Sequence, residues 1–241
     1  MTIAAPGRRP SAKALAAVAR RLPAPAAPAV GRALRALGLA AAALSAVLAC
    51  AAPGARAEED PAGPRIRHWS KDWATDFSRR TVDLTAIVSG GVPRDGIPAL
   101  DRPAHVPAAA GLLPEAEPVL AIDPEDGPPR AWALRHLMWH EIVNDAVAGR
   151  PVAATWCPLC NSALVFEARL PGEDGRDLSF GVTGKLRASD MVMYDRETES
   201  WWQQIEGEAI AGELAGARLE RVPSWIESYG RFRAREGARI M

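Results

Sequence analysis

Residues 151–162, which read PVAATWCPLCNS, decide how the rest of the chain is interpreted. The run 152–156 is β-prone, and it leads directly into Cys157 and Cys160, the closely spaced cysteine pair of this sequence. Two cysteines separated by two residues can close a small disulfide, share a metal ion, or cycle between thiol and disulfide. The sequence therefore predicts a cysteine-centred site at the end of a strand.

The segment before this strand has the spacing of an amphipathic helix. Apolar residues recur three and four positions apart at Leu134, Leu137, Met138 and Ile142. Residues 148–151, AGRP, contain the glycine and proline that end helices. His140 lies on this predicted helix, shortly before the cysteine strand, and we expect it to be the third ligand of a metal held by Cys157 and Cys160. Soft thiolates suit zinc, or copper in its reduced state.

Two other interpretations of the cysteine pair stay open. The first is a non-catalytic module stapled by a structural disulfide. The second is a thiol-disulfide oxidoreductase, since Trp156 and Cys157 are similar to the start of a thioredoxin-type WCxxC. Such redox sites open a helix after a strand, whereas residues 161–166 lead into another predicted strand. The sequence leaves undecided whether the protein is an enzyme.

The first 57 residues have the composition of a secretory leader. They hold eight Lys or Arg and no Asp or Glu, an apolar run at 36–52, and Ala55-Arg56-Ala57 before the acidic Glu58. A disordered basic tail is the alternative. Residues 47–50, VLAC, resemble a lipoprotein processing box, so a lipidated Cys50 would be the route to a membrane. We expect an exported, periplasmic or envelope-anchored protein, with a linker at 58–72 and a single domain at 73–241.

Charge and length constrain the function of the mature chain. Without the leader, 21 basic residues face 29 acidic ones, a net charge near −8, which argues against a general nucleic-acid binder. The remaining 184 residues suffice for one sizeable core. Short predicted strands follow the cysteines, with a break at Thr183 and Gly184 and a last helix at 224–233. The predicted fold is α+β, mainly an antiparallel sheet of short strands, with one key helix beside the cysteine strand and a C-terminal helix.

The chain from about Trp73 to its C-terminus resembles the bacterial and archaeal family called domain of unknown function 3179. The motifs that carry the resemblance are DGIPAL at 95–100, WHEIVND at 139–145, PVAATWCPLCNSALVF at 151–166, FGVTGKLRASDMVMYDRETESWWQQ at 180–204 and AIAGELAGARL at 209–219. Two positions depart from what the resemblance implies. His136 stands where an aliphatic residue is expected, and Ala188 where Asn is expected. The resemblance implies no activity.

Several further polar residues are candidates for supporting roles. Glu141, Asn144, Asp195 and Arg196 are expected to orient the ligands from a second layer. Trp201, Trp202 and Gln203 are expected to line a ligand cleft. A zincin is disfavoured because Asn144 replaces the second His of HExxH, and a serine hydrolase is disfavoured because no serine has a nucleophile-elbow context.

Overall fold

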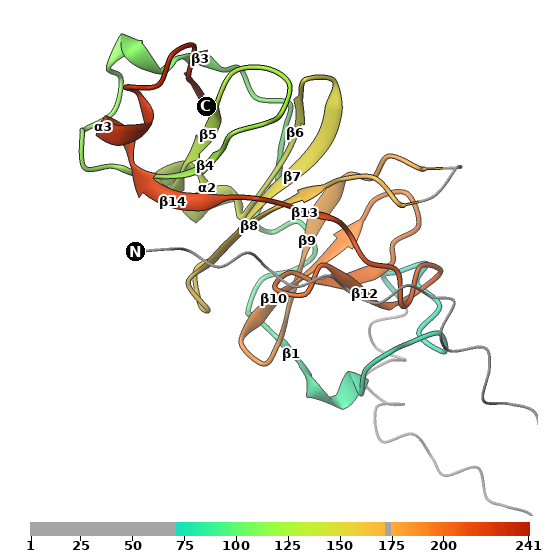
Figure 1. Ribbon diagram of the computed structural model, residues 1–241. Coiled ribbons are helices and arrows are strands. Elements are labelled where there is room, and N and C mark those ends of the chain that lie inside the picture. Colours follow the sequence, from blue (N-terminus) through green and yellow to red (C-terminus); the bar gives the residue numbers. More distant parts are fainter. Residues whose placement is uncertain (1–70, 172–174) are drawn as a thin grey trace, which may run out of the picture. The chain divides into compact units, whose positions relative to one another are not determined.

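The computed structural model describes residues 71–171 and 175–241 (Figure 1). The predicted leader at 1–57, and the predicted linker as far as residue 70, lie outside these residues. None of the helices in residues 71–171 and 175–241 has the length and apolar composition of a membrane-spanning segment.

Short strands form three five-stranded sheets within the described residues. Sheet A has the order β1 (Ile87–Ser89), β9 (Phe180–Arg187), β10 (Asp190–Asp195), β11 (Trp201–Gln203) and β12 (Glu208–Ala211). Sheet B has the order β13 (Arg221–Val222), β8 (Ser162–Glu167), β7 (Arg150–Cys157), β6 (Ile142–Val147) and β2 (Leu100–Asp101). Sheet C has the order β14 (Trp225–Ser228), β4 (Pro118–Ile122), β5 (Arg130–Ala133), β15 (Arg239–Ile240) and β3 (Val106–Pro107). Most neighbouring pairs are antiparallel, which confirms the predicted α+β fold of short, mainly antiparallel strands.

Helices are few and shorter than predicted. The described residues contain α2 (Leu134–His140), α3 (Tyr229–Phe232) and the 3₁₀ turns η1 (Leu84–Ala86) and η2 (Ala108–Ala110). The predicted extension of α2 to 148–151 is wrong, because Glu141 takes φ 56° and Ile142 begins β6. The predicted helix at 224–233 is also wrong over its first half. Residues 225–228 pair with β4 as β14, and α3 follows them (Figure 1).

Sheet B lies between the other two sheets, as the buried side chains show. One apolar cluster joins β6, β7 and β8 to residues of β9, β10 and β11, for example Phe166 to Trp202. A second cluster joins the opposite face of sheet B to β4, β5 and α2, for example Val152 to Trp132 and Leu137. The two faces of β7 therefore pack against different layers of the protein.

Alternation along β7 assigns its residues to these two faces. Successive side chains of a strand point to opposite sides. Ala153 and Cys157 belong to the cluster shared with sheet A, whereas Ala154 and Trp156 belong to the cluster shared with sheet C and α2. Cys157 consequently faces sheet A.

The predicted break at Thr183 and Gly184 is wrong, because both residues lie within β9. Val182 pairs with Met193 and Lys185 pairs with Val192, so two residues of β9 bulge out between neighbouring residues of β10. Gly184 has φ 71°, and a Cβ at this position would overlap the carbonyl of Val92. The bulge therefore requires glycine.

Candidate functional site

Two hairpin tips from different sheets meet at the cysteines. Strands β7 and β8 are joined by a turn in which Cys157 pairs with Ser162, and Cys160 lies in the turn itself. Strands β9 and β10 are joined by Ala188 and Ser189, with Asp190 as the first residue of β10. Because Cys157 faces sheet A, the cysteine turn meets the start of β10. The donor atoms of Cys157, Cys160 and Asp190 all lie within 4.8 Å of one another.

Specific polar contacts link the two tips. The Sγ atom of Cys160 lies 3.3 Å from Oδ1 of Asp190 and 3.0 Å from Oγ of Ser162. The Sγ atom of Cys157 lies 3.7 Å from the carbonyl O of Ser189. Both cysteines are free thiols, Cys157 buried and Cys160 partly exposed.

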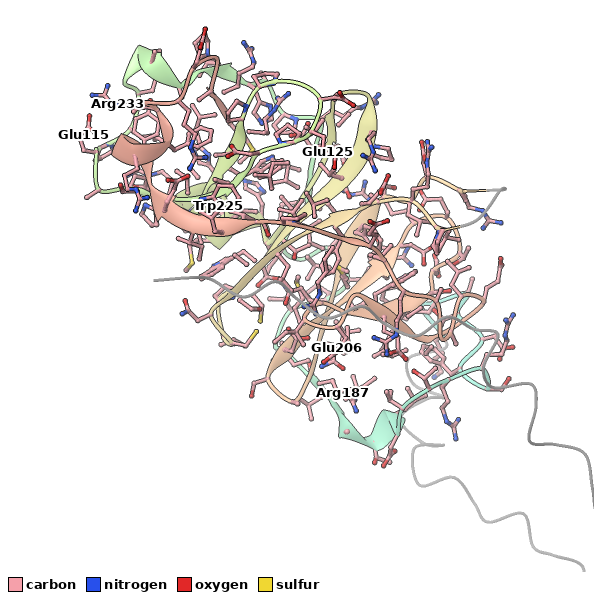
Figure 2. The ribbon with its side chains drawn as sticks, in the orientation of Figure 1. Glu115, Glu125, Arg187, Glu206, Trp225 and Arg233 are labelled. Atoms are coloured by element: carbon pink, nitrogen blue, oxygen red, sulfur yellow. The ribbon has the colours of Figure 1, made fainter. Side chains whose placement is uncertain are left out.

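The segment after β11 also contacts Asp190. The backbone N–H of Ile205 donates to Oδ2 of Asp190 at 3.0 Å. Arg187, at the end of β9, donates to Oε1 of Gln203. Arg187 and Glu206, which follows Ile205, are labelled in Figure 2. The carboxylate of Asp190 is thereby held in place with its Oδ1 directed toward Cys160.

The backbone around the two tips is in unusual conformations. Asn161 has φ 51°, Ala188 has φ 51° and Ser189 has φ 65°. Asn tolerates the left-handed region, but Ala and Ser adopt it at a cost. Strained residues that persist in a well-packed region often accompany functional sites. Ala188 stands where the family resemblance predicts Asn, and its backbone conformation is one that Asn adopts more readily than Ala.

Their surroundings make Cys160 and Asp190 hard to ionise. Burial, together with the neighbouring Cys157 and Asp190, raises the pKa of the Cys160 thiol to about 12. Burial also raises the pKa of Asp190, although the N–H of Ile205 opposes this. Low dielectric and like charge both disfavour the anionic forms. A nearby cation would reverse this preference.

The structure does not bring His140 to the thiols. Its helix α2 packs through Leu134 and Leu137 on the face of sheet B that looks toward sheet C, and Cys157 is on the other face. The Nδ1 atom of His140 lies 2.7 Å from the carbonyl O of Pro98 instead. The structure therefore does not place His140 as a third ligand beside the cysteines, and the group that lies beside both thiols is the carboxylate of Asp190.

The four residues expected to support the site have other contacts. Asn144 bridges strands by donating to Phe180 O and Asp101, at 2.9 and 2.8 Å, and by accepting from Phe180 N. Asp195, at the far end of β10 from Asp190, accepts from Thr198 N–H and from the indole of Trp202. These contacts organise strands and a turn rather than metal ligands.

The other two supporting candidates are likewise engaged elsewhere. Arg196 forms an ion pair with Asp101 at 2.8 Å. Glu141 caps the end of α2, and its carbonyl accepts from Trp156 N–H at 2.7 Å. Burial raises the pKa of its carboxyl to about 7.

The expected ligand cleft at Trp201, Trp202 and Gln203 is not present. Both indoles are fully buried, on opposite faces of sheet A, and Gln203 is 5% exposed. Period-two alternation along β11 places the two tryptophans in different apolar clusters. Both are core residues.

Sequence reasoning missed Asp190 and Ser162. Ser162 follows Cys160 by two positions and could have been found from the short turn alone. Asp190 comes directly after two residues with turn character, so its place at the start of a strand was also open to prediction. Its meeting with the cysteines depends on how sheets A and B pack, which no local pattern reports.

The fold and site together define a β-rich α+β protein with a largely buried cysteine–carboxylate cluster. The chain belongs to the family described as Protein of unknown function (DUF3179), whose model matches residues 94–240. This confirms the resemblance seen in the sequence motifs. No curated protein and no solved structure matches the chain.

Proposed function

We propose that the protein binds a transition metal through Cys157, Cys160 and Asp190, with zinc as the preferred ion and reduced copper as the alternative. The observation that carries the proposal is the convergence of two thiols and a carboxylate, from two sheets, within 4.8 Å. Zinc takes Cys sulfur and Asp oxygen as ligands, usually in tetrahedral geometry. Copper in its reduced state favours sulfur more strongly and gains less from a carboxylate.

The environment of the donors supports a cation. Cys157 and Asp190 are 1% and 3% exposed. Groups that are costly to ionise alone become good ligands when a divalent ion supplies the opposing charge. Because the thiols must lose protons to bind, affinity should fall as pH falls.

The same environment disfavours the oxidoreductase. A catalytic cysteine needs an accessible thiolate with a lowered pKa. Here Cys157 is buried, and the pKa of the more exposed Cys160 is raised to about 12. A structural disulfide remains compatible with the spacing of the pair and is the outcome against which the metal should be tested.

The test is a competition titration of reduced protein with zinc and a chromophoric chelator. Cys157→Ser, Cys160→Ser and Asp190→Asn should each weaken zinc binding, the cysteine variants by more than about 100-fold, since a hydroxyl replaces a soft ligand. His140→Ala and the exposed Glu206→Gln are matched controls and should retain wild-type affinity. The proposal fails if wild type binds zinc no more tightly than the double cysteine variant.

We also propose that the mature protein is exported, because of the charge change after Ala57. Intact-mass analysis of native protein should show a chain that starts at Glu58 or at a lipidated Cys50. A full-length chain that retains Met1 in the cytoplasm would contradict export.

A further inference from the structure

The hydroxyl of Ser162 has two neighbours and can donate to only one of them. Its Oγ lies 2.8 Å from Oε1 of Gln204 and 3.0 Å from Sγ of Cys160. A serine hydroxyl has one hydrogen and two acceptor lone pairs. Whichever neighbour receives the hydrogen, the other faces a lone pair.

The orientation of Gln204 decides which neighbour that is. The Nε2 atom of Gln204 lies 2.9 Å from Oγ1 of Thr155 and 3.5 Å from the carbonyl O of Ser162. Thr155 donates its own hydrogen to Leu164 O at 3.0 Å, so its oxygen accepts from Gln204. The amide nitrogen therefore faces Thr155, and Oε1 faces Ser162.

This arrangement is locked because its members are buried. Gln204 and Thr155 are both fully buried, and each side-chain polar atom of Gln204 has a protein partner. Turning the Ser162 hydroxyl toward Cys160 would leave Oε1 of Gln204 without a donor, which is costly in the interior. The hydrogen of Ser162 is consequently directed to Gln204, and a lone pair is directed to Cys160.

We infer that Ser162 is the fourth donor to the metal held by Cys157, Cys160 and Asp190, and that Gln204 is a positioning residue that aims its lone pair. The inference rests on the proposed function. In a tetrahedral zinc site, sulfur and oxygen ligands lie about 3.6 Å apart. The Sγ atom of Cys160 is 3.0 Å from Ser162 Oγ and 3.3 Å from Asp190 Oδ1, so a small opening of the cluster would admit the ion. Two oxygen donors beside two thiolates favour zinc over reduced copper.

Cobalt(II), a spectroscopic probe for zinc sites, tests this placement by gain of signal. Ser162→Cys should add a third thiolate, and the sulfur-to-cobalt charge-transfer absorption should rise by about half, in proportion to the thiolates bound. Ser78→Cys adds an exposed thiol in another segment and should leave the absorption at the wild-type level. Ser162→Ala should weaken zinc binding by about 10-fold, because three protein donors remain.

Gln204→Met tests the positioning role. It should weaken zinc binding by about 10-fold and shift the cobalt d–d bands without changing the charge-transfer intensity, since both thiolates remain. The double variant with Ser162→Cys and Gln204→Met should regain zinc affinity, because a thiolate has no hydroxyl hydrogen that Gln204 must orient. A merely structural role for Gln204 would not give this rescue. Thermal unfolding of each variant shows whether it is folded.

The outcomes separate this inference from the proposed function. If Ser162→Cys gives the wild-type absorption and Ser162→Ala binds zinc with wild-type affinity, Ser162 is not a ligand, while the site of Cys157, Cys160 and Asp190 stands. If wild type shows no charge-transfer absorption with cobalt(II), the metal site itself is wrong and the inference falls with it.

Discussion

The carboxyl of Glu141 should make the stability of this protein depend on pH near neutrality. Burial raises its pKa from 4.5 to about 7. The folded state therefore holds a proton that the unfolded state has released between these two pH values. At pH 4 the carboxyl is mainly protonated in both states, so its raised pKa hardly lowers the free energy of unfolding. The loss of stability grows as pH rises from 4.5 toward 7. Above pH 7 it levels off at roughly 3 kcal/mol.

Replacing Glu141 with Gln removes this titration and keeps the size of the side chain. We expect the free energy of unfolding of Glu141→Gln, relative to wild type, to rise by roughly 3 kcal/mol between pH 4 and pH 8. Urea unfolding at several pH values measures this difference in free energy of unfolding. A pH-independent effect of the amide on stability would shift all values equally and would not change how the difference depends on pH. The exposed Glu206→Gln serves as control and should give a much flatter difference. An equally flat difference for Glu141→Gln would contradict a raised pKa of the Glu141 carboxyl.

Three further predictions concern the fold and can be checked by urea unfolding. Ala188→Asn should stabilise the protein by about 0.5–1 kcal/mol, because Asn tolerates the φ of 51° in the β9–β10 turn; an unchanged or lowered midpoint would contradict this. Gly184→Ala should destabilise it by at least about 3 kcal/mol, since a Cβ would overlap Val92 and φ is 71°; a variant as stable as wild type would argue against the bulge. Leu137→Asp should cost on the order of 3 kcal/mol or more, because Leu137 is fully buried in the cluster between sheets B and C; an unchanged midpoint would mean that this face of α2 is exposed.

The sequence predicted several local features of this fold. Strand β7 ends at Cys157 as expected, and Cys160 lies in the following turn. The apolar spacing also located the start of α2 and the buried side of Leu137. It failed at the end of this helix, because Ile142 continued the helical spacing although it begins strand β6. A single apolar residue can fit both the spacing of a helix and the alternation of a strand. At Ile142, pairing with β7 selects the strand.

The composition of the site was less predictable than its location. His140 is close to Cys157 along the chain, but sheet B separates α2 from the face on which Cys157 lies. Asp190 is distant in sequence, and the packing of sheet A on sheet B brings it to the cysteines. Sequence distance was therefore misleading, because a β-strand directs successive side chains into different layers.

X-ray absorption at the zinc edge of reduced, zinc-loaded protein shows whether Cys157, Cys160 and Asp190 hold a metal. We expect one tightly held zinc with two sulfur neighbours at about 2.3 Å and oxygen neighbours at about 2.0–2.2 Å, and the loss of one sulfur in Cys160→Ser. Zinc that washes out of the reduced protein, or that has no sulfur neighbours, would contradict it.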